Sequence, residues 1–181
     1  WVFLEAIFSG SSDIKNLLPQ ESSRFETINI EFLNLMKKVG KSRLILEVLT
    51  IEGIERTLER LADLLTKIQK ALGDYLEKQR SAFPRFFLVG DEDLLEIIGS
   101  SKDILKIQKP LKKMFAGLSS LVLDDTQQII TGMSSAEGEV VPFKKNVVLK
   151  DYSSIDRWLD ALEQEMKKTL AGLLQDAVRE L

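Results

Sequence analysis

The side chains available for acid–base or metal chemistry are few, because the 181-residue chain contains no histidine and no cysteine. Histidine is the commonest general base and metal ligand, and cysteine thiolates hold most structural zinc and all common iron–sulfur sites. Hydroxyl side chains are plentiful, but no base of the usual kind is present to activate them. The sequence therefore predicts no catalytic residue, no cofactor-binding residue and no metal ligand. The lack of cysteine also favours a reducing compartment.

One short motif, Gly40-Lys41-Ser42, resembles the end of a phosphate-binding loop. The complete pattern needs a glycine five positions before Gly40, where Leu35 stands, and a strand in front of the loop. Residues 25–39 instead carry apolar side chains at helical spacing. We therefore expect a helix that ends at Gly40, followed by polar residues, and no nucleotide binding.

A cluster of carboxylates, Asp91-Glu92-Asp93, follows Gly90. Hard divalent cations take carboxylate ligands, but no calcium-loop spacing follows the cluster. An N-cap at Asp91, with the other acids at the positive end of a helix dipole, accounts for the same residues. We expect a short helix over 94–98 with Asp91 as its cap.

A basic stripe is formed by lysines at steps of four, three and four: Lys102, Lys106, Lys109 and Lys113. On a helix these side chains share one face, opposite an apolar stripe that runs from Ile104 to Met114. Such a face can dock an acidic partner surface, or it can simply be solvated, which is the commoner case. The sequence leaves both interpretations open.

Composition places the chain among soluble globular proteins, with 44% hydrophobic and 29% charged residues. The net charge of −3 argues against a dedicated nucleic-acid binder. No apolar run reaches the roughly 18 residues that a membrane span needs, and no basic segment precedes an apolar core as in a signal peptide. Both ends fall within apolar, helix-like patterns, so we expect the sequence to be part of a longer protein.

Apolar periodicity predicts several helices in the first half of the chain. The tail of a helix over 1–8 and at most a short turn over 11–18 precede a helix over 19–39, and a short apolar piece follows at 44–49. The strongest pattern spans 51–80 and is expected to end before Pro84. Its apolar stripe alternates steps of three and four: Ile51, Ile54, Leu58, Leu61, Leu65, Ile68, Leu72 and Tyr75.

The second half of the chain changes in kind. Residues 86–89 predict a buried strand or an extended connector, and residues 102–116 a helix that Pro110 kinks or divides in two. Short β-prone runs at 119–123, 128–131, 140–143 and 147–149 predict an antiparallel meander with turns at 124–125 and 134–138.

A last helix over 154–181 is expected to start with a capping box of Ser153 and Asp156. Its apolar stripe is Ile155, Leu159, Leu162, Met166, Leu170, Leu173 or Leu174, and Val178. The predicted fold class is mainly α, with helical bundles and a small antiparallel β meander inserted before the last helix.

Several longer stretches resemble one protein family. Phe83-Pro84-Arg85-Phe86, followed by the acidic helix at 91–99, is similar to a step found in the linker of dynein heavy chains. Residues 89–93 with 112–117 resemble cytoplasmic rather than axonemal dyneins. Further similar stretches are 1–8, 11–14, 17–19, 68–77, 132–135, 158–159 and 165–166. The resemblance extends over essentially all of residues 1–181, and it implies a partial linker from the central to late portion of this region. Its expected parts are a helical part over 1–118, a β insertion over 119–150 and a long helix over 151–181 that continues beyond the sequence.

The resemblance implies a mechanical role. In this family the linker is a helical arm across a ring of AAA+ modules, which it contacts within the same heavy chain. The arm bends and straightens as the ring binds and hydrolyses ATP with Mg²⁺, and so delivers a minus-end-directed power stroke on microtubules. The implied setting is cytoplasmic and cytoskeletal, with other subunits of the dynein complex and the microtubule reached through other parts of the heavy chain. Neither nucleic acid nor membrane is an expected partner.

Two functions from different classes follow from the sequence. One is this mechanical element, for which residues 99–101 and Pro110 are candidate bending positions. The other is a helical scaffold or adaptor module without a motor role. An adaptor should bind a partner stably on its own, whereas a lever should act only when joined to its ring.

Overall fold

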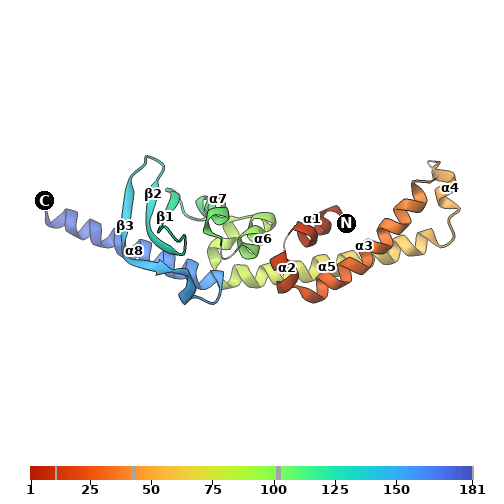
Figure 1. Cartoon of the computed structure of the whole chain (residues 1–181), viewed down its shortest axis with the longest axis horizontal. Helices are drawn as coiled ribbons and strands as arrows, with labels where there is room; N and C mark the ends of the chain where they lie inside the picture. The colour runs from red at the N-terminus through yellow and green to blue at the C-terminus, as the bar shows by residue number, and fades with distance from the viewer. Residues whose placement is uncertain (11, 42–43, 101–102, 181) are drawn as a thin grey trace. The chain divides into compact units, whose positions relative to one another are not determined.

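The computed structural model describes residues 1–10, 12–41, 44–100 and 103–180. It divides into two compact units, Trp1–Glu77 and Lys78–Leu181, and the boundary falls inside a long helix. The described residues are mainly helical and include one three-stranded antiparallel sheet ahead of the last helix, which confirms the predicted fold class (Figure 1). Among these residues no helix is both long and apolar enough to cross a lipid bilayer.

The first unit begins with the helices α1 (Val2–Gly10), α2 (Ser12–Leu17) and α3 (Pro19–Val39). The bounds of α1 and α3 are close to the predicted ones, whereas α2 is a six-residue helix where at most a short turn was expected. Pro19 occupies the first turn of α3, where its missing N–H costs no hydrogen bond. Aromatic pairs hold α1 and the residue before it against α3. Trp1 lies 4.9 Å from Phe32, and its indole N–H donates to the Asn29 side-chain oxygen at 2.9 Å. Phe8 stacks on Phe25 at 5.4 Å, so ring contacts link the two helices along their length.

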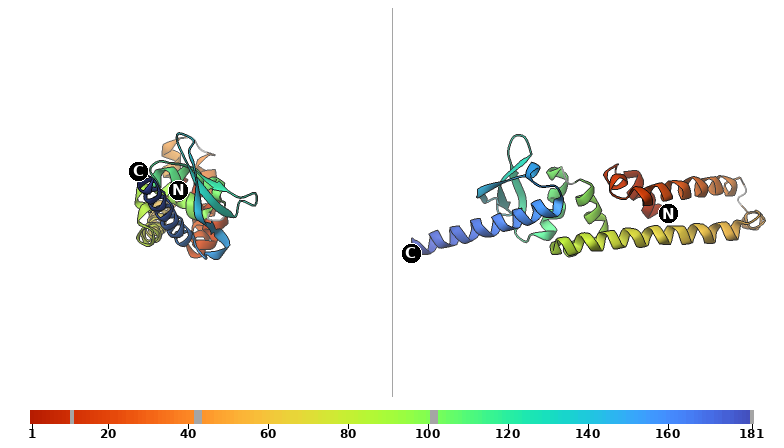
Figure 2. Two further views of the ribbon diagram at one scale, coloured as in Figure 1. Left: turned by 90° about the vertical axis from the view of Figure 1, so that its left-hand side faces the viewer. Right: turned by 90° about the horizontal axis from the view of Figure 1, so that it is seen from below.

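The helix α4 (Ile45–Leu49) contains no buried residue, and α5 (Ile54–Ala82) follows it. The predicted start at 51 was too early, because Gly53 has a φ of +70°, a left-handed conformation that a helix cannot contain. The predicted end before Pro84 is correct. In Figure 1 and in the right-hand view of Figure 2 the first part of α5 runs beside α3, and an Arg60–Glu31 ion pair joins the two helices.

The buried stripe of α5 is narrower than the sequence pattern and shifts toward its C-terminal end. Leu58 is 45% exposed, while Leu65 and Tyr75 are only half-buried. Leu76, which we did not predict, is 1% exposed. The buried set is Ile54, Leu61, Ile68, Leu72 and Leu76. These positions keep seven- and four-residue steps, as expected for a helix with 3.6 residues per turn.

In the second unit, α5 is followed by a 3₁₀ turn, η1 (Pro84–Leu88), so both the predicted strand and the extended connector over 86–89 were wrong. Proline at the first position suits a helical turn, and it places Phe86 inside and Phe87 outside. Two helices come next, α6 (Asp91–Gly99) and α7 (Ile104–Met114). Pro110 lies buried inside α7, which is one helix and not two.

The start of α7 is fixed by the Asp103 carboxylate, which accepts from the Lys106 N–H at 3.4 Å. The start of α6 differs from our prediction, because Gly90 and not Asp91 is its N-cap residue. Asp91 is the first residue of the helix, and its carboxylate lies 2.6 Å from the Arg80 guanidinium. An ion pair to the end of α5 therefore takes the place of the expected cap.

Three strands form the meander: β1 (Leu118–Leu123), β2 (Ile129–Ser135) and β3 (Val140–Val148), in the order β1-β2-β3 (Figure 1). The runs at 140–143 and 147–149 were predicted as separate, but β3 is continuous to Val148. The first turn is built by Asp124, whose carboxylate accepts from the N–H groups of Gln128 and Ile129 at 3.0 and 2.9 Å. A hydrogen bond from the Thr126 hydroxyl, followed by these backbone bonds, lowers the pKa of Asp124.

The last helix, α8 (Ile155–Arg179), begins one residue later than predicted. Its N-cap residue is Ser154, which makes no side-chain cap bond, so the expected Ser153–Asp156 capping box is absent from these described residues. The first part of the predicted stripe is buried, at Ile155, Leu159 and Leu162. The second part is not buried: the stripe residues Leu170, Leu173, Leu174 and Val178 are exposed. Glu165, Thr169 and Gly172 are buried in their place.

Candidate functional site

Arg85 contacts several elements of the second unit. Its Nε and Nη2 atoms donate to the two Glu163 carboxylate oxygens at 2.9 and 3.3 Å, and its Nη1 donates to the Met114 carbonyl oxygen at 2.8 Å. The guanidinium carbon lies 4.7 Å from the centre of the Phe115 ring. One side chain on η1 thereby joins the end of α7 to α8. We call this arrangement the Arg85 junction.

The junction owes its geometry to the residues around Arg85 in the sequence. Phe83 and Phe86 are 3% and 0% exposed, and their rings meet edge to face at 5.1 Å. These two anchors fix the turn that Pro84 begins, so the Arg85 side chain between them has little freedom. The planar guanidinium fork then matches the two carboxylate oxygens, a geometry that lysine cannot reproduce.

The electrostatics of the junction favour an ionised Glu163. Hydrogen bonds from Arg85, and then from Lys167, hold the pKa of Glu163 below its ordinary value of 4.5. The Lys167 ammonium lies 2.6 Å from the same carboxylate, one helical turn away. The Glu163 carboxylate thus lies between two cations and forms ion pairs with both. We therefore assign this arrangement a structural role.

The acidic cluster at the start of α6 is also engaged in structure. Asp91 pairs with Arg80 as described above, and Asp93 pairs with Lys113 of α7 at 2.5 Å. Each carboxylate thus ties α6 to a different neighbour. This use of the cluster differs from the expected helix cap.

The predicted basic stripe is partly neutralised by the same contacts. Lys113 pairs with Asp93, and Lys106 lies 3.4 Å from the Asp103 carboxylate. Lys109 forms no ion pair with any described residue, and Lys102 lies outside the described residues. The described lysines of the stripe therefore do not form one uniform free surface.

The motif Gly40-Lys41-Ser42, which resembles the end of a phosphate-binding loop, begins where the predicted helix over 19–39 ends. Gly40 is the C-cap residue of α3, so the element before it is a helix and not the strand that a phosphate-binding loop requires. Lys41 lies in the following turn, and Ser42 lies outside the described residues.

Side chains from the helices satisfy backbone donors on both edge strands of the sheet. Glu165 accepts from the Lys145 N–H of β3 at 2.8 Å, and Thr169 accepts from the Lys144 N–H at 3.4 Å. On β1, the Leu121 N–H donates to the Gln108 side-chain oxygen of α7 at 3.3 Å. These bonds attach the β insertion to α7 and α8, and they explain why Glu165 and Thr169 are buried.

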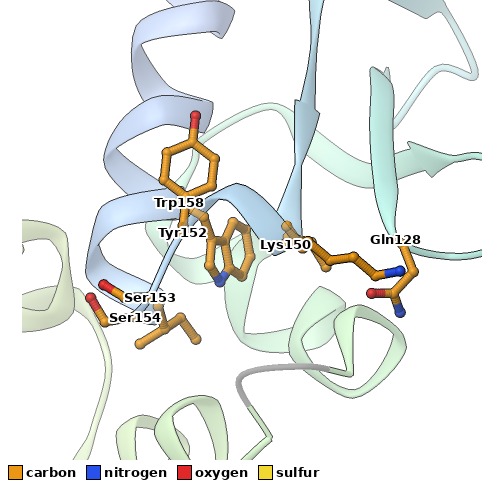
Figure 3. Close-up of a pocket in the computed structure, with 8 residues that line it drawn as sticks. Gln128, Lys150, Tyr152, Ser153, Ser154 and Trp158 are labelled. Atoms are coloured by element: carbon orange, nitrogen blue, oxygen red, sulfur yellow. The ribbon is translucent and has the colours of Figure 1, made fainter.

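A hollow of about 450 Å³ lies beside the start of α8. Figure 3 shows the indole of Trp158 among the residues that line it, with the side chains of Lys150 and Gln128 together on one side. Trp158 is 3% exposed, and its ring N–H has no hydrogen-bond partner among the described residues. The complete lining is Gln128, Leu149, Lys150, Tyr152, Ser153, Ser154, Ile155 and Trp158. We call it the α8 hollow.

Sequence reasoning identified neither the Arg85 junction nor the α8 hollow. Arg85 was part of a motif that carried the resemblance, but its partner Glu163 lies 78 positions later. The one local signal was an arginine directly after proline and between Phe83 and Phe86, which places a cation on a rigid turn.

Comparison with known proteins identifies the family. Residues 1–177 match the family model for the N-terminal region 2 of dynein heavy chains. The chain is 62% identical over 179 residues to the cytoplasmic dynein heavy chain of Dictyostelium discoideum, and 56% identical over 181 residues to that of Drosophila melanogaster. It is 43% identical over 178 residues to cytoplasmic dynein 2 heavy chain 1 of Mus musculus. These alignments cover 98 to 100% of the chain but only 4% of each relative. The chain therefore belongs to the dynein heavy chain family, in the part described as N-terminal region 2.

Proposed function

We propose that the chain is a mechanical element of a cytoplasmic dynein motor, a piece of the linker that bends over the AAA+ ring. In this proposal the ring supplies ATP hydrolysis and holds ATP and Mg²⁺, while this segment transmits the resulting displacement as a minus-end-directed power stroke on microtubules. The ring would be its partner within the same heavy chain. Complex subunits and the microtubule would be reached through other regions, in the cytoplasm and at the cytoskeleton.

The Arg85 junction is the observation that supports this role best. A lever transmits force only if its helices keep their relative positions under load. In the second unit, a single side chain holds η1, the end of α7 and α8 through two oxygens of Glu163, one carbonyl and one ring. The ion pairs Arg80–Asp91 and Asp93–Lys113 add α6 to the same body.

The bending positions belong to the proposal as well. Gly99 is the last residue of α6 and is buried, Ser100 follows it, and Ser101 lies outside the described residues. Pro110 is buried inside a continuous α7. The Asp93–Lys113 pair spans the connection between α6 and α7, so bending at residues 99–101 would have to break it.

The test uses a complete motor that carries Arg85→Ala. We expect slower microtubule gliding while basal ATP hydrolysis by the ring is retained, because a loosened lever wastes part of each stroke. Arg179→Ala is the matched control, since Arg179 is 77% exposed and its one ion pair in the described structure lies within its own helix. Unchanged gliding with Arg85→Ala would contradict the proposal.

The adaptor alternative makes the opposite prediction for the isolated chain. A scaffold module should bind a protein partner stably without the ring, and Arg85→Ala should then weaken that complex. If the isolated chain forms such a complex and the motor carrying Arg85→Ala keeps its gliding speed, the adaptor function replaces the mechanical one.

A further inference from the structure

We infer that the α8 hollow is a docking site for a carboxylate side chain of an acidic protein segment. Binding by this chain alone does not depend on the lever proposal. The ring N–H of Trp158 is buried and has no hydrogen-bond partner among the described residues. A buried donor without an acceptor lowers stability, and an incoming acceptor would recover that loss.

Two polar side chains around the hollow can only donate hydrogen bonds, and the others can donate as well as accept. The indole N–H can only donate, the Lys150 ammonium has three N–H bonds and no lone pair, and the hydroxyls of Ser153 and Ser154 can donate. Lys150 is exposed and forms no ion pair with any described residue. Gln128 can present either end of its amide. A ligand that complements this set must bring acceptors, preferably with negative charge.

The start of α8 adds to the same preference. The N-cap residue Ser154 leaves the first N–H groups of a 25-residue helix without a side-chain acceptor. This helix end carries the positive pole of the helix dipole, which attracts anions. In Figure 3 the indole nitrogen points away from the Tyr152 hydroxyl, toward the side where Ser154 lies. The unpaired indole and the uncapped helix end therefore favour the same kind of ligand.

The acids close to the hollow do not fill this role. Asp151 and Asp156 adjoin the hollow in sequence, but neither is among its lining residues. The Asp156 carboxylate lies 3.8 Å from the Arg157 guanidinium. A carboxylate that supplies the missing acceptor must come from another segment. A side chain of glutamate or aspartate has two acceptor oxygens, enough for Lys150 and one further donor.

The experiment uses Trp1→Phe, which leaves Trp158 as the sole tryptophan of the chain. Its indole N–H then gives one cross peak in a ¹H–¹⁵N correlation spectrum. The probe is a blocked Gly-Gly-Glu-Gly-Gly peptide, compared with the same peptide carrying glutamine. We expect a saturable downfield movement of the indole proton with the glutamate peptide, and at least a tenfold weaker response with the glutamine peptide.

Two lysine substitutions complete the test. Lys150→Met, at an exposed position, should weaken binding at least tenfold, whereas Lys168→Met, at an exposed position on α8 outside the lining, should leave it unchanged. An indole peak that does not move, equal responses to both peptides, or no effect of Lys150→Met would overturn the inference. A Lys150-dependent response to inorganic phosphate but not to the glutamate peptide would also overturn it, because the site would then be selective for a different anion.

Discussion

Arg85→Ala should be the most informative substitution in the second unit. The two-point ion pair with Glu163 is intermediate in burial, with side-chain exposures of 35% and 16%, so it should contribute about 1–2 kcal/mol, between exposed and buried pairs. The bond to the Met114 carbonyl and the contact with the Phe115 ring should add about 1 and 0.5 kcal/mol. We expect Arg85→Ala to lower the free energy of unfolding by about 3 kcal/mol.

The two tryptophans show which of the two units loses unfolding free energy when Arg85 is replaced by alanine. Trp158 lies on α8 in the second unit and Trp1 in the first, so Trp1→Phe and Trp158→Phe backgrounds report on one unit each. Urea unfolding followed by Trp158 fluorescence should show the full loss. Arg85→Lys should fall between wild type and Arg85→Ala, because lysine keeps the charge but not the fork.

A double-mutant cycle with Glu163→Gln isolates the ion pair, and pH gives a second check. The pKa of Glu163 is lowered in the folded state, so its contribution is complete above the ordinary value of 4.5 and disappears as the pH falls below 4.5 through the folded-state pKa. The coupling energy should be about 1 kcal/mol or more at pH 7 and near zero once Glu163 is protonated. A loss below about 0.5 kcal/mol for Arg85→Ala, or a coupling that does not change with pH, would refute the reasoning.

Three further predictions concern the cores and the β insertion. Gly132→Ala should destabilise by about 1–3 kcal/mol in urea unfolding, because its new Cβ would lie 2.7 Å from the Val141 carbonyl oxygen; Gly73→Ala, with open space around it on α5, should instead stabilise by up to about 1 kcal/mol. Leu61→Ala should lower stability by about 2–5 kcal/mol and the half-buried Leu65→Ala by clearly less, so equal losses in thermal melts would contradict the observed stripe. Shortening the tip at 136–138 should change the unfolding free energy by less than about 1 kcal/mol, since loop length alters closure entropy slowly, and a chain that no longer folds by circular dichroism would disprove this.

The helices of this chain were predictable where their apolar stripe and their stop signals agreed. For α3, Pro19 and Gly40 mark the two ends, and both bounds matched. For α5, the apolar stripe predicted the helix correctly. The first residue of the helix is set by the left-handed conformation of Gly53, which apolar periodicity does not reveal. Helix caps were predicted less well, because Asp91 has a long-range partner in Arg80 that competes with local capping.

The β insertion was correctly predicted as an antiparallel meander, but the bounds of its last strand were not. Residues 144–146 looked like a break because they are polar, yet all three are exposed positions within β3. An edge strand tolerates such a run when its backbone donors find partners elsewhere. Here the partners are Glu165 and Thr169 on α8, which lie 20 and 25 positions after the residues they bind. Contacts at that separation leave no trace in a local pattern.

The same contacts explain why the apolar pattern predicted the wrong buried residues for the second half of α8. A helix is expected to bury the residues of its apolar stripe, and up to Leu162 it does. Beyond that point the neighbour of α8 is β3, an edge strand with free N–H groups, and a strand edge is best covered by acceptors. Glu165 and Thr169 provide these acceptors, and Gly172 makes room for the Lys144 side chain, which a Cβ would meet at 2.2 Å. The buried face of α8 thus rotates from one that fits apolar side chains to one that fits a backbone edge. In the lever proposal, this change of face lets one helix fasten both the Arg85 junction and the β insertion into the same body.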